Sequence, residues 1–260
     1  MNRATLRLSG FAIAGMIAVV VAPPAEAQRN PFRREVDFSK YNTPYDGRFT
    51  FLRLRYEPLS RGMGRFRGGD AGWAHDYPTA ERNLMKLLSE LTEIRPYMDG
   101  GNIFPMDARE IFQYPIAYLS EPGFWSLSEA EAAGLRAYLN KGGFLIVDDF
   151  DGMDWINFED KMHTVLPDGA IVPLDLAHPV FHTFFEITSL EYQHPYSGDA
   201  AQFLGIFEHN DPKGRLMVVV NYNNDIGDYW EWSDQGFFPI ELSNEAYKLG
   251  INYIVYAMTH

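Results

Sequence analysis

The chain has 260 residues, a formal net charge of −13 at pH 7 and no cysteine. Its acidic balance argues against a nucleic-acid partner or a polyanionic membrane surface, because both attract positively charged proteins. Without cysteine, the chain cannot form disulfides, carry a lipid on a cysteine or use a thiol as a nucleophile.

The first 27 residues have the composition of a secretory signal peptide. Arg3 and Arg7 give a positive start, an apolar stretch follows at 11–22, and Ala25-Glu26-Ala27 matches the small-x-small cleavage pattern. The apolar stretch is shorter than the ~20 residues that span a bilayer. We therefore expect a signal peptide at 1–27, a periplasmic or secreted protein, and no transmembrane segment after cleavage. An uncleaved anchor is the alternative.

Residues 28–48 are polar and aromatic without periodicity, which predicts an extended N-terminal arm before a single α/β domain at 49–260. The domain begins with alternating apolar and polar residues at 49–56, the pattern of a strand. A loop rich in glycine and arginine follows at 61–72. It lacks the phosphate-binding glycine motifs, so a solvated loop is favoured over an anion cradle. Apolar residues then recur at helical spacing, at Leu84, Leu87, Leu88, Leu91 and Ile94.

An apolar strand is predicted at 114–120 and a helix at 127–141. Ser128 and Glu131 have the spacing of a capping box at the start of that helix, and Gly142-Gly143 follow its end.

A continuous apolar run at 144–147 predicts a buried strand that ends in an acidic turn, and a further helix is expected at 155–166. Two more strands are predicted at 202–207 and 215–222, and a closing apolar helix at 242–258. Alternating strands and helices indicate a mostly parallel sheet covered on both faces. The last two strands have a short link, which favours an antiparallel hairpin. We expect an α/β three-layer sandwich with an antiparallel edge hairpin.

The loops after the predicted strands carry aromatic, carboxylate and imidazole side chains, at the edge where parallel sheets bind their ligands. Aromatic rings cover the apolar faces of sugars while polar groups bond the hydroxyls, so this composition predicts a small polar, glycan-like ligand. The expected ligand-binding residues are Trp125, Asp148, Asp149, Trp155 and Asp228. The candidates for a catalytic group are Asp148, Asp149, His75 and Glu121.

Each of these features has a structural alternative. The aspartates could cap a helix or bond loop amides, and the tryptophans could be core packing. His75 beside Asp76 is either an oriented base or a helix-start hydrogen bond. No spacing matches a calcium loop or a zinc helix motif, so no resident cofactor is expected. A site for a divalent cation stays open as an alternative, and its oxygen ligands would come from Glu121, Asp148, Asp149, Asp151 and Asp228.

Six segments together resemble the bacterial domain of unknown function 4159 family over roughly residues 49–260. They are GNIFP at 101–105, EPGFW at 121–125, GGFLIVDDFDG at 142–152, HPVFH at 178–182, GRLM at 214–217 and GINYIVYAMTH at 250–260. The resemblance implies a flavodoxin-like, class I glutamine amidotransferase-like fold of the trehalose-utilisation-like branch. Gly142-Gly143, His178-Pro179 and Glu191-Tyr192 stand at places comparable to that branch.

The resemblance also bears on activity. In amidotransferases of this fold, the turn after the Gly-Gly strand carries a cysteine nucleophile, whereas this chain has Asp148 or Asp149 there. A carboxylate cannot form the thioester that glutamine hydrolysis uses, so we expect no glutaminase activity. Members of the family are often found with MoxR-type ATPases and von Willebrand A-type proteins, which implies a role in the cell envelope and partners there.

The sequence therefore favours an exported domain without glutaminase activity that binds a small polar, glycan-like ligand in a cell-envelope role. One alternative is a carboxylate- or metal-dependent hydrolase acting on glycans. The other is a structural partner in an envelope complex. The motifs leave open whether the chain is an enzyme.

Overall fold

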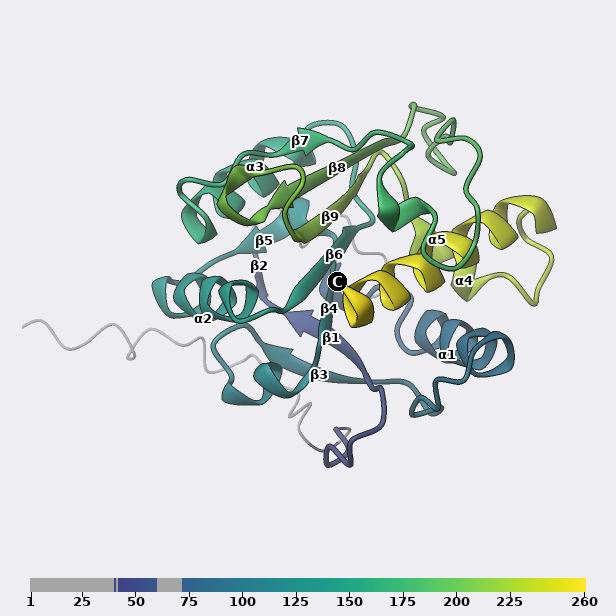
Figure 1. The fold of residues 1–260 in the computed structure, drawn as a ribbon, viewed down its shortest axis with the longest axis horizontal. Coiled ribbons are helices and arrows are strands. Elements are labelled where there is room, and N and C mark those ends of the chain that lie inside the picture. The colour runs from purple at the N-terminus through teal and green to yellow at the C-terminus, as the bar shows by residue number, and fades with distance from the viewer. Residues whose placement is uncertain (1–39, 41, 60–71) are drawn as a thin grey trace, which may run out of the picture. The chain divides into compact units, whose positions relative to one another are not determined.

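The fold is built on a seven-stranded sheet in the order β3-β1-β4-β6-β9-β8-β7 (Figure 1). The computed structural model describes residues 40, 42–59 and 72–260, all within one compact unit, Phe38–His260. In chain order the strands of this sheet are β1 (Phe51–Arg55), β3 (Gly101–Pro105), β4 (Ile116–Ser120), β6 (Phe144–Asp148), β7 (Val172–Pro173), β8 (Gln202–Phe207) and β9 (Leu216–Tyr222). A two-stranded antiparallel sheet joins β2 (Glu57–Pro58) to β5 (Trp125–Ser126).

Five neighbouring strands are parallel, and two reverse direction. The parallel strands are β3, β1, β4, β6 and β9, whereas β8 runs antiparallel to both β9 and β7. Every residue of β6 is buried, in keeping with a strand that is covered on both faces. The predicted mostly parallel sheet is confirmed, and so is the antiparallel pairing of β8 with β9. The outermost strand on that side is β7, which the sequence patterns did not predict.

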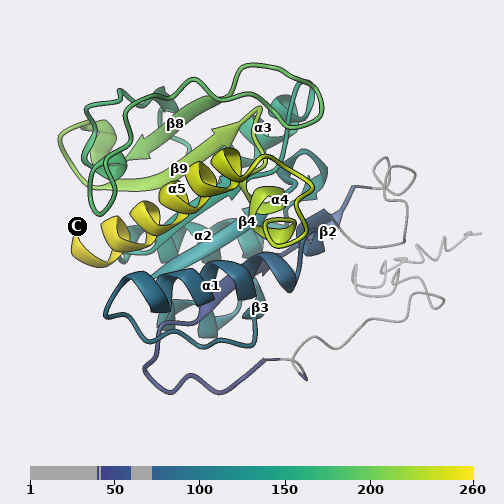
Figure 2. The ribbon, with the colours of Figure 1, turned by 90° about the vertical axis from the view of Figure 1, so that its right-hand side faces the viewer.

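Helices cover both faces of the sheet (Figures 1 and 2). On one face, α4 (Ile226–Glu231) contacts both α1 (Thr79–Leu91) and α5 (Ile240–Thr259). The helices α2 (Glu129–Asn140) and α3 (Asp154–Val165) contact each other on the opposite face. Each face of the sheet has its own core cluster. Successive residues of a strand point to opposite faces, so Ile146 belongs to one cluster and its neighbours Leu145 and Val147 belong to the other. The three-layer architecture is confirmed.

Short 3₁₀ helices complete the described elements. They are η3 (Gly72–Ala74), η4 (Arg109–Gln113), η5 (Pro122–Phe124), η6 (Pro179–Phe181) and η7 (Glu208–Asn210). The capping box predicted from Ser128 and Glu131 is present at the start of α2, and Gly142 follows the helix with a φ of 105°. None of the helices in the described ranges is both long and apolar enough to cross a membrane.

Some predicted features lie wholly or partly outside the residues that the structure describes. The predicted signal peptide at 1–27 and positions 61–71 of the glycine- and arginine-rich loop lie outside the described residues. The expected arm is described at 40 and 42–48. There Asn42 exchanges two hydrogen bonds with the backbone of Ile103, at 2.8 and 2.7 Å, and so lies against the outer side of β3.

Candidate functional site

The carboxyl ends of β4, β6 and β9 lie at one edge of the sheet, and an unusual backbone conformation follows each strand. Glu121, Asp149 and Asn223 come directly after these strands, with φ angles of 51°, 62° and 54°. Positive φ is uncommon for residues other than glycine. Such conformations persist where the surrounding structure holds them, and they cluster at functional sites. The three turns therefore mark this edge as the candidate site.

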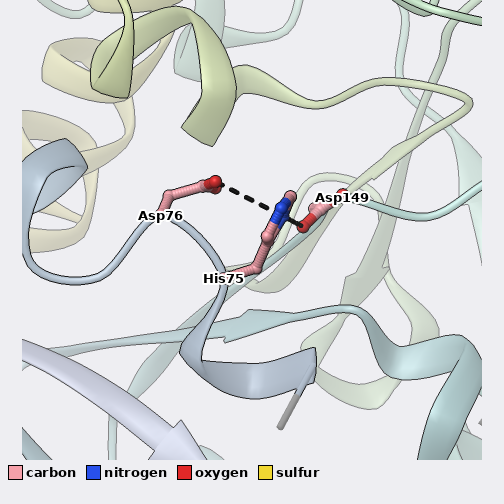
Figure 3. A group of neighbouring side chains, drawn as sticks. All are labelled: His75, Asp76 and Asp149. Carbon is pink, nitrogen blue, oxygen red and sulfur yellow. Dashed lines mark hydrogen bonds and ion pairs between the residues drawn. The ribbon is translucent and has the colours of Figure 1, made fainter. Parts of the chain in front are cut away.

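Asp149 lies on the turn after β6, the central strand of the sheet. Its carboxylate is buried, and Oδ2 accepts a hydrogen bond from the hydroxyl of Ser120 at 3.0 Å. The same oxygen lies 2.8 Å from Nδ1 of His75 (Figure 3). Groups from two other segments of the chain thus fix the direction of this carboxylate.

His75 lies on the turn between η3 and α1, and a buried arginine holds that turn. Nη1 of Arg53 donates hydrogen bonds to the carbonyl oxygens of Trp73 and His75, at 2.9 and 2.7 Å. Nε of Arg53 pairs with Glu81 of α1 at 2.5 Å, and both side chains are buried. The Arg53–Glu81 pair therefore joins the sheet, the turn and the helix beneath His75.

The imidazole of His75 is exposed, with 46% of the side chain accessible. The hydrogen bond to Asp149 is the largest cause that raises the pKa of His75 to about 10, against the lowering effect of burial. The ring is therefore positively charged at neutral pH when no other ligand is bound. Within the described part of the chain, Nε2 has no hydrogen-bond partner, so this nitrogen can reach a ligand.

Asp76 approaches the same ring nitrogen from another direction (Figure 3). Its Oδ1 lies 3.3 Å from Nδ1 of His75, and its side chain is 0% exposed. Neither carboxylate oxygen accepts a hydrogen bond from the residues that the structure describes. Burial and the charge of Asp149 raise the pKa of Asp76 well above its usual range. A buried carboxylate without donors is costly, so Asp76 requires a proton or a cation.

Asp148 is the last residue of β6 and is fully buried. Its Oδ2 accepts hydrogen bonds from the hydroxyl of Tyr118 at 2.8 Å and from the backbone N–H of Gly227 at 3.0 Å. Burial, followed by the charge of Asp149, raises the pKa of Asp148 to about 7. Asp148 therefore connects β4, β6 and α4 inside the protein and is not itself a surface contact.

The segment that begins α4 adds two further carboxylates. Asp225 caps the helix by accepting a hydrogen bond from the backbone N–H of Asp228 at 2.9 Å. Asp228 in turn accepts a hydrogen bond from the hydroxyl of Tyr196, a residue that is 61% exposed. Burial and then the charges of Asp149 and Asp76 raise the pKa of Asp225 well above its usual range.

Three overlapping sets of described residues have donor atoms within 4.8 Å of one another, close enough to share a metal ion. They are His75 with Asp76 and Asp149, His75 with Asp225 and Asp228, and Asp76 with Asp228 and Glu231. We call the six residues of these sets the acidic cluster. Its chemistry suits cation binding, hydrogen bonding to hydroxyl groups and proton transfer.

Three of the predicted site residues, His75, Asp149 and Asp228, belong to the acidic cluster, and Asp148 lies beside it in the interior. Glu121 occupies the turn after β4, but its side chain is in none of the three sets. Asp151, named as an oxygen ligand, lies 3.9 Å from Nε2 of His194 and is also outside the sets.

The two predicted tryptophans stand apart from the acidic cluster. Trp125 lies in β5 with 0% exposure, packed in the core cluster on the α2 and α3 face. It has no surface left for a ligand, and we remove it from the site. Trp155 is half-buried and packs on Phe150 and Tyr222, with ring centroids 6.5 and 4.9 Å away. It forms an aromatic cluster near the start of α3.

Sequence reasoning missed Ser120, Tyr196 and Asp225 as site residues, and it named Asp76 only as the neighbour of His75. Ser120 ends a predicted strand, so the strand-end rule could have found it. Asp225 had a weaker signal, the polar Asn-Asn-Asp run after β9. Tyr196 lies in a stretch for which no element was predicted, and no local pattern indicated its contact with Asp228.

The region that matches a protein-family model has nearly the same bounds as the folded region. The family model described as "Domain of unknown function (DUF4159)" matches residues 50–258, from the start of β1 to the end of α5. No curated protein matches the chain closely enough to add to this. Because the match covers most of the sequence, the chain belongs to the DUF4159 family.

Proposed function

We propose that this chain is an exported protein that binds a small polar, glycan-like ligand at the carboxyl-terminal edge of its sheet, in a cell-envelope role. The observation that carries the proposal is the His75–Asp149 pair, in which an exposed imidazole is held at 2.8 Å by a buried carboxylate. Ordered polar groups at the carboxyl edge of a parallel sheet are the usual setting for ligand recognition in α/β proteins.

The groups around this pair suit a ligand rich in hydroxyls. His75 supplies an exposed nitrogen donor, and Asp149 and Asp228 supply carboxylate acceptors whose directions are fixed by Ser120 and Tyr196. The exposed ring of Tyr196 offers an apolar face beside Asp228. Sugars combine apolar C–H faces with hydroxyl groups, so an aromatic ring next to fixed acceptors matches their chemistry.

We further infer that the protein does not hydrolyse glutamine, whether or not its fold shares ancestry with class I amidotransferases. The turn after β6 carries Asp149 at a φ of 62°, and the chain has no cysteine to form a thioester there. A glutaminase assay on the purified chain tests this directly. Release of ammonia from glutamine above the level of an Asp149→Ala variant would contradict the inference.

Ligand binding is best tested with cell-wall sugar fragments and isothermal titration calorimetry on three variants. Asp149→Ala is expected to abolish binding without unfolding the protein, and Tyr196→Ala to weaken it by removing the aromatic face. The matched control is Phe112→Ala, because Phe112 is also an exposed aromatic but lies before β4, away from the carboxyl edge. If a fragment binds and Asp149→Ala binds it equally well, the proposed site is misplaced.

A specific observation also favours the hydrolase alternative, namely that His75 has two carboxylate oxygens within 3.3 Å of one ring nitrogen. Such a group can position a proton or a metal-bound water near a bound glycan. Release of reducing ends from the same fragments by the parent chain, and its loss in His75→Gln, would support hydrolysis. Binding without turnover would support recognition alone. Absence of both would shift the weight to a structural partner in an envelope complex.

Export is tested separately, by expressing the full chain and fractionating the cells. We expect the periplasmic fraction to contain a protein whose first residue is Gln28, following cleavage after Ala27. A chain found only with the cytoplasmic fraction and retaining Met1 would contradict the proposed location.

A further inference from the structure

We infer that the acidic cluster is a binding site for a divalent transition-metal cation, with His75, Asp76 and Asp149 as its ligands. No metal-binding motif is present in the sequence, because the ligands come from two segments of the chain that are far apart. No organic ligand is needed to form this site.

The distances between the donor atoms match those of a metal site. Metal ligands bonded at about 2.1 Å lie about 3.0 Å apart along the edge of an octahedron and about 3.4 Å apart along that of a tetrahedron. Nδ1 of His75 lies 2.8 Å from Oδ2 of Asp149 and 3.3 Å from Oδ1 of Asp76. Figure 3 shows the two carboxylates directed at the same ring nitrogen. The separations are those of donor atoms arranged around a first-row cation.

Asp76 accepts no hydrogen bond from the described residues. A ring nitrogen carries at most one hydrogen, and that hydrogen is directed to Asp149, the only one of the two carboxylates with which His75 forms a hydrogen bond. Asp76 is fully buried, and its two oxygens accept nothing from the residues that the structure describes. Buried charges in proteins are paired or coordinate metals. A cation between the three side chains would satisfy Asp76 and Asp149 at once.

Buried carboxyl groups outnumber the cationic groups at this edge of the sheet. Five aspartates at this edge are at least nine-tenths buried: Asp76, Asp148, Asp149, Asp225 and Asp228. Among the described residues, the cationic groups near them are His75 and Arg53, and Arg53 is already paired with Glu81. These carboxyl groups are shielded from water, so they must either hold protons or share a cation. A divalent cation bound here would replace protons as the compensating charge.

Asp228 lies beside the three ligands. It shares one set with His75 and another with Asp76, but no set contains both Asp228 and Asp149. Ser120 donates its hydroxyl to the ligand Asp149. Hydrogen bonds of this kind orient the ligands of known metal sites. One imidazole with two carboxylates suits Zn²⁺ or Mn²⁺, because imidazole suits Zn²⁺, carboxylates suit Mn²⁺, and an all-oxygen set suits Mg²⁺ or Ca²⁺.

The test measures metal directly, with no organic ligand present. The full chain is stripped with a chelator, dialysed against Mn²⁺ or Zn²⁺, and assayed for bound metal by elemental analysis and calorimetry. We expect at least one tightly bound ion in each chain. Asp76→Asn should weaken binding by more than about 100-fold, since removal of groups that merely orient a ligand already costs 10–100-fold. The matched control, Asp160→Asn, changes an exposed aspartate and should bind as the parent does.

Two further measurements, of stability and of metal coordination, distinguish loss of the metal ligands from loss of the fold. The metal-free Asp76→Asn variant should be at least as stable as the metal-free parent, because the amide is always neutral and replaces a buried carboxyl group that has no hydrogen-bond donor. His75→Gln alters an exposed side chain and should remove the nitrogen coupling to bound Mn²⁺ in pulsed electron paramagnetic resonance. The inference is overturned if the parent retains no metal, if Asp76→Asn binds as well as Asp160→Asn, or if bound Mn²⁺ has no nitrogen neighbour. Should Asp76→Asn fail to fold, the His75→Gln comparison decides alone.

Discussion

Asp76 and Gly227 are packed so closely that a Cβ atom on Gly227 would lie 2.5 Å from Oδ2 of Asp76. The same atom would lie 2.8 Å from the hydroxyl of Tyr118. The first turn of α4 therefore forms one wall of the acidic cluster, and only glycine leaves room there for the buried carboxylate. The packing at this contact links the stability of the fold to the geometry of the site.

The first prediction concerns that contact. Gly227→Ala should lower the free energy of unfolding, because overpacking costs about 1–3 kcal/mol and outweighs the gain of up to about 1 kcal/mol in helix propensity. It should also weaken metal uptake by displacing Asp76. Urea unfolding measures the first effect. Gly214→Ala is the control, since its nearest neighbour, the carbonyl oxygen of Asp211, would be 3.1 Å away. A Gly227→Ala protein as stable as the parent would contradict the tight packing.

The second prediction concerns the buried pair of Arg53 and Glu81 beneath His75. Arg53→Met should lower the free energy of unfolding by about 3–5 kcal/mol, because it leaves Glu81 charged and unpaired in the interior. The double variant Arg53→Met/Glu81→Met should recover much of this loss, since apolar pairs replace buried ion pairs at little cost. Denaturant unfolding of both variants measures the difference. Equal stability of the single and double variants would show that the unpaired charge is not the cause.

Arg53 also has a positioning role that this series can separate from stability. Its Nη1 holds the carbonyl oxygens of Trp73 and His75. The double variant should therefore be folded and yet bind metal more weakly than the parent. Unchanged metal binding in the double variant would show that other contacts suffice to place His75.

The third prediction concerns the pH dependence of stability in the metal-free chain. The pKa of Asp148 is raised from 3.8 to about 7 in the folded protein, mainly by burial. The folded state therefore keeps a proton that the unfolded state has lost, so stability contributed by this group falls as pH rises from about 4 to about 7. Asp148→Asn should flatten this decline, because an amide still offers an acceptor to Tyr118 and Gly227. Thermal unfolding across that range, with a chelator present, tests the slope. A variant with the parent's slope would refute the assignment.

The fourth prediction concerns the capping box of α2. Ser128 accepts a hydrogen bond from the backbone N–H of Glu131, and Glu131 accepts one from the backbone N–H of Ser128. Ser128→Ala should lower the free energy of unfolding by about 0.5–2 kcal/mol, the usual cost of a lost N-cap. Ser89→Ala removes a surface hydroxyl that bonds the carbonyl oxygen of Lys86 and should stay within about 0.5 kcal/mol of the parent. If the two substitutions lowered the free energy of unfolding equally, the capping box would not be the source of the stabilisation.

Local patterns in the sequence were sufficient for much of the fold. The apolar run of β6, the alternation at 49–56 and the capping signals of α2 each act over a few residues, and the structure confirms the two strands and the capped helix. The burial of β1 does not alternate, because Arg53 is buried with its apolar neighbours. Strand β3 was not predicted, because its five residues begin with Gly101, end with Pro105 and show no alternation of apolar and polar side chains. Helix α4 has six residues, too few for a helical period to be recognised.

The sequence by itself determined that aspartates follow a buried strand, that no thiol is present, and that His75 stands next to Asp76. Only the tertiary structure decided which of these groups meet. Parallel strands bring their carboxyl ends to one edge whatever their separation along the chain, and so Asp149 and His75 meet although 74 positions separate them. The tertiary structure also decided that Trp125 is in the core and that the hydroxyl of Tyr196 reaches Asp228. Burial and distance are properties of the packed chain, and they bring carboxylates that are scattered in the sequence into one cluster that must hold protons or a cation.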